Sequence, residues 1–317
     1  MTPRILLTGK NGLIGYDLHN LLPRLGELVA LDRQHLDLSQ PDEIRRVIRE
    51  FRPNLIVNAA AYTAVDQAEK EESLVEAINA RAPAILAEEA KRIGAAMVHY
   101  STDYVFDGAK NSPYDESDRT NPLNVYGRTK LAGELAIRDS GAHHLIFRTA
   151  WVYSTRGKNF LLTILRLATE RNELRIVNDQ IGAPTWSREI ASGSVQVLQH
   201  VLGPKEKSGA WAELSGTYHM TAAGKTNWFE FAKAILHDAQ SQADAPASWF
   251  AAATDGKPLV ARNVVAITTS DYPTPARRPP YSVLSNARLS QLFGVKLSDW
   301  RVQLHRACSD ERIIATE

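Results

Sequence analysis

The sequence predicts an α/β protein in which a doubly wound parallel sheet is followed by a smaller α/β domain. From Arg4 to about Ala150, short apolar runs alternate with longer amphipathic stretches, as in strands joined by crossover helices. After Tyr153 this alternation becomes irregular, which indicates a second architecture. With 317 residues and 44% hydrophobic content, the chain is long enough to form two domains.

The first half contains five predicted strands, each a short apolar run that ends near small or polar residues. They are RILLTG (4–9), ELVALD (27–32), LIVNAAA (55–61), AMVHYSTD (96–103) and HHLIFRTAWVY (143–153). The helices between them carry their own end signals. A helix at 41–51 has Ser39 as its expected N-cap and Pro41 in its first turn, and a helix at 74–94 closes on Gly94.

The second half shows fewer and less regular elements. We expect two helices, a loop between them, a short strand, and an Ala-, Ser-, Gln- and Asp-rich surface insertion or mobile loop. In chain order these are 159–170 (helix), 177–186 (loop), 187–202 (helix), 216–220 (strand) and 239–263 (insertion).

Composition excludes several classes of partner and site. A net charge of +1 gives no broad field for a nucleic-acid backbone or an acidic membrane surface. The stretch MTPRILLTG has too short an apolar run for a signal peptide, and no window approaches the roughly 20 apolar residues of a membrane span, so we expect neither. Cys308 is the only cysteine, which excludes an intrachain disulfide and a zinc site of several thiolates. We therefore expect a cytoplasmic protein that acts on small molecules.

The stretch TGKNGLIG places Gly9, Gly12 and Gly15 directly after the first strand and at the start of a helix. Glycine permits positive φ and lets the backbone approach a pyrophosphate, which lies against the unpaired N–H groups of the helix. A tight turn without a ligand is the alternative, but the position after the first strand favours a dinucleotide. The spacing differs from the common G-x-G-x-x-G and points to a subset of reductases.

Asp32 and Arg33 follow the second predicted strand and argue for different cofactors. An acidic side chain at Asp32 accepts hydrogen bonds from the adenosine ribose of NAD, whereas Arg33 suits the 2′-phosphate of NADP. The choice between NADH and NADPH stays open. Asp37 and Leu38 are weaker candidates beside the adenine, and the small residues at 58–66 suit either a cofactor floor or close helix packing.

Thr102, Tyr126 and Lys130 form the predicted catalytic group. Thr102 ends a buried strand, where open α/β sheets bind ligands, and Tyr126 and Lys130 are four residues apart on one helix face. A phenol has a pKa of about 10, and a nearby ammonium or oxidised nicotinamide lowers it. We expect Tyr126 to protonate a carbonyl oxygen that Thr102 orients, while Lys130 also binds the nicotinamide ribose.

These motifs resemble the extended short-chain dehydrogenase/reductase family. Several stretches are similar to one branch of it, which uses NADPH or NADH to reduce the carbon-4 ketone of dTDP-4-dehydro-β-L-rhamnose to dTDP-β-L-rhamnose for surface-polysaccharide synthesis. The stretches are HYSTDYVFDG, YGRTKLAGE, RTAWVY, DQIGAPT and RRPPYSVL. The resemblance implies an NAD(P)-binding Rossmann domain at 1–153 and a mainly nucleotide-sugar domain at 154–317, with about 187–222 returning to the first.

The resemblance also implies site residues. For the sugar it implies Thr102, Asp103, Tyr126 and Trp151, whose indole suits the C–H face of a deoxysugar unless it is simply buried in the core. Gln180 and Thr185 suit either a substrate loop or a structural role. The implied cofactor contacts are Gly9, Asn11, Gly12, Leu13, Ile14, Gly15, Asp32, Arg33, Asp37, Leu38, Ala61, Tyr62, Thr63, Tyr100, Tyr126 and Lys130.

Some relatives form a magnesium-bridged dimer through clustered acidic side chains. Here Arg188 stands beside Glu189 and no dense carboxylate cluster is visible, so the sequence supports no metal site, although a homodimer stays open. Two other functions stay open as well. One is a nucleotide-sugar epimerase or dehydratase, although Tyr104 after Asp103 speaks against a dehydratase; the other is a non-catalytic NADP-binding regulatory subunit.

Overall fold

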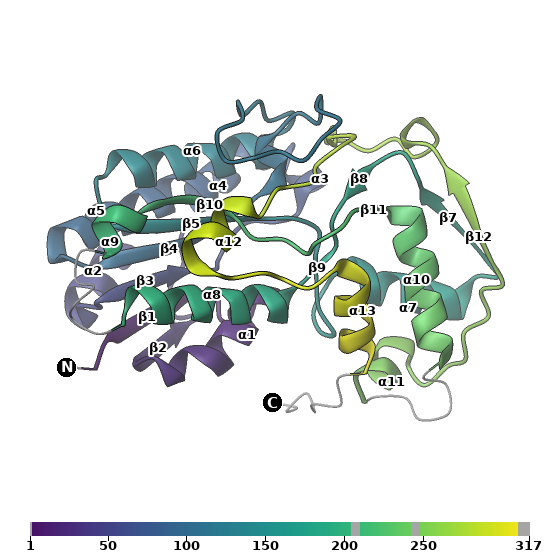
Figure 1. Cartoon of the computed structure of the whole chain (residues 1–317), viewed down its shortest axis with the longest axis horizontal. Coiled ribbons are helices and arrows are strands. Elements are labelled where there is room, and N and C mark those ends of the chain that lie inside the picture. Colours follow the sequence, from purple (N-terminus) through teal and green to yellow (C-terminus); the bar gives the residue numbers. More distant parts are fainter. Residues whose placement is uncertain (1, 204–209, 242–247, 310–317) are drawn as a thin grey trace.

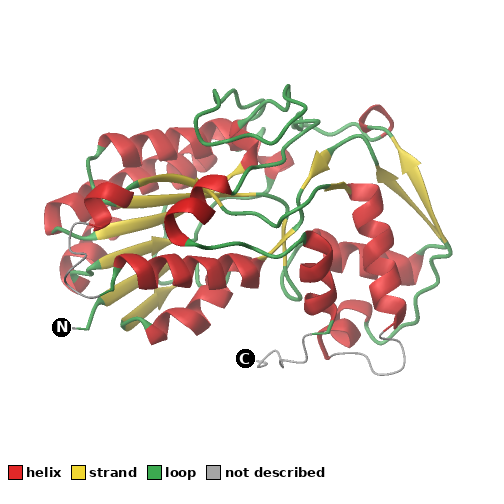
Figure 2. Ribbon diagram, in the orientation of Figure 1, coloured by secondary structure: helices red, strands yellow, loops and turns green. Residues whose placement is uncertain are grey.

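The computed structural model describes residues 2–203, 210–241 and 248–309 (Figure 1). A six-stranded parallel sheet with the order β10-β5-β4-β3-β1-β2 forms its larger unit, which confirms the predicted doubly wound α/β fold (Figure 2). The strands are β1 (Arg4–Thr8), β2 (Glu27–Leu31), β3 (Leu55–Asn58), β4 (Ala96–Thr102), β5 (His144–Thr149) and β10 (Gly216–His219). The order reverses between β1 and β3, and this switch point is where such sheets bind ligands.

Helices cover both faces of the sheet, which explains why its strands read as nearly continuous apolar runs. On one face, Ile5 and Leu7 of β1 pack with α1 (Leu13–Leu21), α8 (Ser187–Val201) and α12 (Ala287–Phe293). On the other face, Leu6 packs with α2 (Pro41–Phe51), α5 (Ala82–Ile93) and α6 (Val125–Asp139). Successive strand residues therefore belong to different cores, as the two-residue period of a strand requires.

A second unit lies beside the sheet, on the right of Figure 1. Its buried aromatic and aliphatic side chains, including Tyr153, Phe231 and Trp300, form a separate core. Its helices are α7 (Phe160–Glu170), α10 (Trp228–Ser241), α11 (Ser248–Thr254) and α13 (Trp300–Cys308), and its strands are β7 (Glu173–Val177) and β12 (Asn263–Ile267), which pair in parallel. The boundary predicted at residue 153 stays a prediction.

Short paired strands connect the two units: β6 (Val152–Tyr153) pairs with β9 (Thr185–Trp186), and β8 (Ile181–Gly182) pairs with β11 (Thr226–Asn227). The short helix α9 (Ala210–Leu214) precedes β10 and packs against the core of the sheet. Because β10 pairs with β5, the chain that leaves the sheet after β5 comes back to it before it enters α10.

Three local predictions were wrong in part. The strand expected at 143–153 is broken after Thr149, and Trp151 between β5 and β6 has a positive φ of 47°. Ser39 does not cap α2, because its hydroxyl donates to Asp37. In the insertion predicted at 239–263, residues 248–254 form α11 with a buried Trp249, whereas 242–247 lie outside the described residues.

The helix expected at 74–94 also differs in detail. It is divided into α4 (Glu72–Glu76), a π-helical turn (Ala77–Arg81) and α5. Its predicted end is confirmed, because Gly94 terminates α5 in the left-handed conformation with φ of 72°.

Candidate active site

The glycine loop between β1 and α1 is packed so closely that a side chain cannot replace Gly9 or Gly15. Gly9 has a φ of 76°, and a Cβ there would strike the backbone of Ala60. A Cβ on Gly15 would strike the Gly9 carbonyl, while the Gly12 N–H donates to that same oxygen at 2.9 Å. The loop therefore leads directly into the N-terminus of α1, a cradle that fits a dinucleotide pyrophosphate.

At the end of β2, the Asp32 carboxylate already has several partners. One of its oxygens lies 2.6 Å from His35 Nδ1, and the other lies 3.2 Å from Asn11 Nδ2 and 3.5 Å from Lys10 Nζ. The hydrogen bond from His35 contributes most to lowering the pKa of Asp32 to about 2. Asp32 is therefore ionised across the neutral range. Sequence reasoning missed Lys10 and His35, although Lys10 lies between Gly9 and Asn11 and His35 lies two residues from Arg33.

The remaining predicted cofactor residues are held in different ways. Arg33 is 74% exposed, and its Nε lies 3.9 Å from the Asp37 carboxylate. Leu38 is buried against the apolar core, and its predicted place beside the adenine stays a prediction. The Tyr62 hydroxyl donates to Glu71. The neighbours of Tyr62, Ala61 and Thr63, follow β3, and Leu13 and Ile14 begin α1.

Tyr100 points away from the predicted site. Its hydroxyl donates to Ser194 of α8 at 2.7 Å, on the opposite face of the sheet from α6. Its carbonyl accepts a hydrogen bond from Lys130 Nζ at 2.6 Å. Of the Tyr100 atoms, the main-chain carbonyl therefore lies nearer the predicted site than the side chain does. The contact of Tyr100 with the cofactor stays a prediction.

The structure brings Thr102 and Tyr126 together. Asn124 caps α6 by accepting from the Gly127 N–H at 2.8 Å, which places Tyr126 in the first turn of the helix. Burial raises the pKa of Tyr126 to about 12, and a hydrogen bond with Thr102 acts in the opposite direction. The phenol is therefore protonated at neutral pH, as a proton donor must be.

Lys130 lies one turn further along α6, and its Nζ points toward strand β4 of the sheet. Nζ is 3.0 Å from His99 Nε2 and 2.6 Å from the Tyr100 carbonyl oxygen. Burial lowers the pKa of Lys130 to about 7, and Glu134 raises it in part. The groups that shift the pKa of Tyr126 are Thr102 and Asp103. The predicted effect of Lys130 on the phenol stays a prediction.

The two carboxylate oxygens of Asp103 differ in their contacts. Its Oδ1 accepts from the Thr102 hydroxyl at 3.0 Å, whereas its Oδ2 is buried without a hydrogen-bond partner among the described residues. Burial raises the pKa of Asp103 to about 6, although hydrogen bonds with the Ser282 and Thr102 hydroxyls lower it in part. An oxygen of this kind is costly unless a ligand group pairs with it, so it fits the predicted contact with a sugar hydroxyl.

Trp151 does not present a free face. Its indole stacks on Trp228 with ring centroids 3.5 Å apart and planes at 6°, and the backbone of Gly182 packs against the other face. The predicted face-to-face contact with a sugar therefore does not match this arrangement. Any contact of Trp151 with substrate would use the ring edge or require Trp228 to move.

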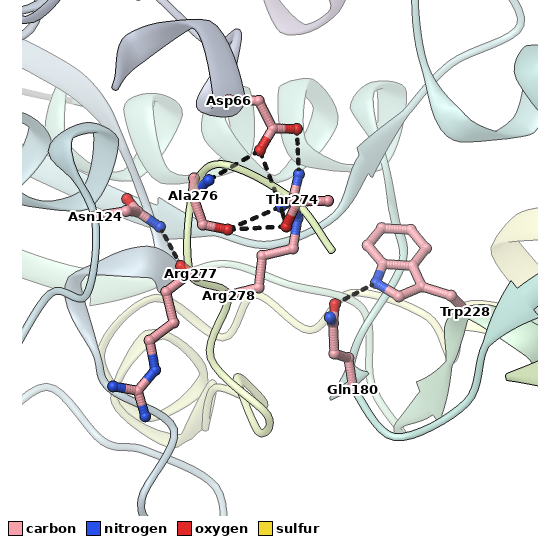
Figure 3. Close-up of polar contacts among 8 residues, drawn as sticks. All are labelled: Asp66, Asn124, Gln180, Trp228, Thr274, Ala276, Arg277 and Arg278. Atoms are coloured by element: carbon pink, nitrogen blue, oxygen red, sulfur yellow. Dashed lines mark hydrogen bonds and ion pairs between the residues drawn. The ribbon is translucent and has the colours of Figure 1, made fainter. Parts of the chain in front are cut away.

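A C-terminal loop is fastened to Asp66 and to Asn124, the N-cap of α6, as Figure 3 shows. Arg278 forms an ion pair with Asp66 at 2.7 Å, and Asn124 Nδ2 donates to the Arg277 carbonyl at 2.8 Å. The Arg278 hydrogen bond lowers the pKa of Asp66. Sequence reasoning noted the RRPP stretch but gave it no contact, because its partner Asp66 is 212 residues away.

The loop around DQIGAPT makes structural contacts. Gln180 accepts from Trp228 Nε1 at 3.2 Å (Figure 3). It also donates to Thr269 at 3.1 Å. The Thr185 hydroxyl accepts from the Ala222 N–H at 3.0 Å. Gln180 therefore holds the tryptophan that covers Trp151.

Comparison with known proteins identifies the family of this chain. The sequence model of the family described as RmlD substrate binding domain matches residues 3–313. The chain belongs to this family. It is 49% identical to a dTDP-4-dehydrorhamnose reductase of Burkholderia thailandensis, covering 94% of this chain and 95% of that protein. It is 41% identical to that of Escherichia coli K12, covering 96% and 97%.

A solved structure agrees with this family assignment. The dTDP-4-dehydrorhamnose reductase of Bacillus anthracis in complex with NADP is similar with a TM-score of 0.83 and 34% identity, covering 96% of this chain and 98% of that one. The resemblance inferred from the sequence motifs is thereby confirmed for the family and for the fold.

Two further observations bear on metals and membranes. Among the residues that the structure describes, no three His, Cys, Asp or Glu side chains gather as metal ligands would. Glu189, at the position considered for magnesium, forms an ion pair with Arg306 at 3.0 Å. Within the same described residues, no helix combines the length and apolar character needed to span a membrane.

Proposed function

We propose that this member of the RmlD substrate binding domain family reduces the carbon-4 ketone of dTDP-4-dehydro-β-L-rhamnose to dTDP-β-L-rhamnose with NADPH or NADH. The observation that carries the proposal is the buried, protonated Tyr126 phenol close to Thr102, whose hydroxyl donates to the buried Asp103 carboxylate. Relatives at 49% and 41% identity bear the name of this activity and support it.

The cofactor would be held by the glycine loop, the N-terminus of α1 and the Asp32 region, which form a cradle of matching chemistry. When bound, the reduced nicotinamide supplies the hydrogen and electron pair that the ketone carbon receives. Lys130 is proposed to bind the nicotinamide ribose, because it lies one helical turn from Tyr126 on α6.

The side chains around Tyr126 have distinct tasks. Tyr126 donates its phenolic proton to the ketone oxygen as negative charge develops there. Thr102, which lies close enough to Tyr126 to lower its pKa in part, is proposed to orient the ketone oxygen beside the phenol. Asp103 accepts a hydrogen bond from a sugar hydroxyl with its Oδ2, which fixes the ring relative to Tyr126.

We also place the protein in the cytoplasm. The proposed reaction consumes NAD(P)H and a nucleotide sugar, and the single buried thiol of Cys308 suits a reducing compartment.

The direct test is turnover with enzymatically prepared dTDP-4-dehydrorhamnose. We expect stoichiometric oxidation of NADPH or NADH and a product with the rhamno configuration by NMR. An epimerase would interconvert sugars without net cofactor consumption. A regulatory subunit would bind NADPH and show no turnover, and either result would refute the proposal.

A further inference from the structure

Three buried polar side chains form a continuous chain beneath Lys130. Thr8 and Asn58 are register partners on β1 and β3, and Asn58 and His99 are register partners on β3 and β4. Each of these three side chains and Lys130 is at most 2% exposed. Register partners project from the same face of a sheet, so the chain runs straight across three strands to α6.

The orientation of the Asn58 amide is fixed by two donors. Its Oδ1 accepts from the Thr8 hydroxyl at 2.6 Å and from the Ala60 N–H at 3.3 Å. Its Nδ2 therefore faces His99 Nδ1, at 3.0 Å. An amide NH₂ can only donate, so Nδ1 must accept. In a neutral imidazole the ring hydrogen then sits on Nε2.

This tautomer determines whether Lys130 Nζ is an ammonium or an uncharged amine. His99 Nε2–H points at Lys130 Nζ from 3.0 Å, and an ammonium, which has only donors, would oppose it. An amine has a lone pair that accepts this hydrogen and still donates to the Tyr100 carbonyl. Burial lowers the pKa of His99 well below its ordinary value and that of Lys130 to about 7, while Glu134 raises the pKa of Lys130.

We propose that Thr8, Asn58 and His99 are positioning residues that hold Lys130 as an uncharged amine until the cofactor binds. The inference rests on the proposed function only for the role of Lys130 at the ribose. It concerns the proton on Nζ, which is measurable without substrate or cofactor.

The chain connects Lys130 to the glycine loop. Charging Lys130 requires the ring hydrogen to move to His99 Nδ1 and the Asn58 amide to turn over, which removes the bond from Ala60 N–H. Thr8 directly precedes Gly9, and Ala60 packs against Gly9. Any shift of the loop on cofactor binding therefore changes the proton affinity of Lys130, and by linkage the proton changes cofactor affinity by the same factor.

The wild-type protein provides the first test, with no variant required. Nitrogen-15 NMR of labelled histidine, on the full chain without cofactor, should show His99 as the neutral Nε2–H tautomer. Lysine side-chain NMR should show Lys130, assigned with Lys130→Met, losing its proton near pH 7. A hydrogen on His99 Nδ1, or a Lys130 ammonium that persists above about pH 9, overturns the proposal.

Asn58→Asp tests whether the ring transmits the effect. The introduced carboxylate accepts from Nδ1–H, so Nε2 becomes an acceptor and favours the ammonium. We expect the pKa of Lys130 to rise by at least about one unit, a tenfold change in proton affinity. In the matched double variant Asn58→Asp/His99→Leu, the carboxylate remains without the ring, and the rise should be much smaller.

Equal rises in the two variants would mean that only the added charge acts, and would overturn the proposal. Circular dichroism checks the fold of each variant, and if either fails to fold, the wild-type NMR result decides. These readouts are independent of turnover. A protein that fails to reduce the sugar nucleotide but shows the expected tautomer would refute only the proposed function.

Discussion

The two ends of the proposed cofactor site differ in how far their ionisable side chains are exposed to water. At the adenosine end, Asp32, Lys10 and His35 form a network in which Lys10 is 27% and His35 59% exposed at the side chain. At the nicotinamide end, His99 and Lys130 are both 1% exposed. Water screens charge at the first end and is excluded from the second.

This difference predicts where substitutions matter. Exposed ion pairs contribute little because solvent replaces a lost partner, so the adenosine end should tolerate changes with modest effects on cofactor choice. In the buried region each polar group depends on a specific partner, so a single lost atom there affects either catalysis or folding. The following predictions are ordered by the size of their expected effect.

The largest effect is expected at Tyr126. Tyr126→Phe keeps the ring and its edge-to-face contact with Tyr104 at 5.7 Å but removes the donated proton. The turnover number should fall by about 10²- to 10⁴-fold, while the Kd for NADPH changes little. Single-turnover kinetics with a fluorescence titration of NADPH checks both quantities. If the variant retains half of the wild-type rate, another group supplies the proton.

The next effect concerns folding. Glu134, which is 0% exposed, accepts hydrogen bonds from Ser101 and from Arg148 at 2.7 Å. Glu134→Gln leaves the buried guanidinium without its counter-charge and should cost about 3–5 kcal/mol of unfolding free energy. Urea denaturation measures this loss.

The matched control for that experiment is Glu50→Gln, which breaks an exposed pair with Arg46 at 3.0 Å. Its expected cost is at most about 0.5 kcal/mol. Similar losses in the two variants would contradict the contrast between buried and exposed charge.

The same contrast explains what the sequence could predict. The strands of the sheet were predictable because burial on both faces selects apolar runs such as Leu55 to Asn58. The break at Trp151 was not, since the apolar pattern continues through it. The positive φ of Trp151 accompanies the pairing of β6 with β9. The strand β9 begins 33 residues after the start of β6, so the pattern around Trp151 does not reveal this pairing.

The site was predictable where spacing along one element carries the information. Tyr126 and Lys130 share a helix, and Thr102 ends a strand, so a motif describes them. His99 and Asn58 were missed because each reads as an ordinary strand residue, and only the register between β3 and β4 makes them neighbours. Motifs record local spacing, whereas buried polar chains depend on register.

A smaller effect is expected from the titration of Asp103. Its pKa of about 6, raised by burial, means that the carboxylate loses its charge as pH falls below this value. The KM for the sugar nucleotide should therefore rise below about pH 6, because the protonated acid accepts a hydrogen bond more weakly. Initial rates between about pH 5 and pH 8 test this.

Asp103→Asn is the companion variant. It should raise KM by roughly 10- to 100-fold at about pH 8, the worth of a charge-assisted hydrogen bond, and it should abolish the inflection. A variant that keeps the wild-type pH dependence would show that a different group titrates.

The smallest effect is expected at the exposed end, where cofactor choice is set. Asp32 favours a free ribose and Arg33 a 2′-phosphate, so we predict use of both cofactors with a preference below about tenfold, which corresponds to about 1.4 kcal/mol. Arg33→Ala should weaken NADPH by a few-fold and leave NADH unchanged. Lys10→Ala should also weaken NADPH, because Lys10 lies 3.5 Å from Asp32 and partly neutralises a carboxylate that repels the phosphate.

Salt provides the sharper test of this last prediction. If these cations act through solvent, raising the ionic strength should remove most of the difference between wild type and each variant, because the Debye length is only about 3 Å at 1 M. Arg46→Ala, at an exposed ion pair of α2, is the matched control and should change neither cofactor. Kd values for NADH and NADPH at low and high salt decide the matter. Equal losses for the two cofactors would remove Arg33 from the 2′ position, and a loss that survives high salt would mean that this end is as shielded from water as Lys130.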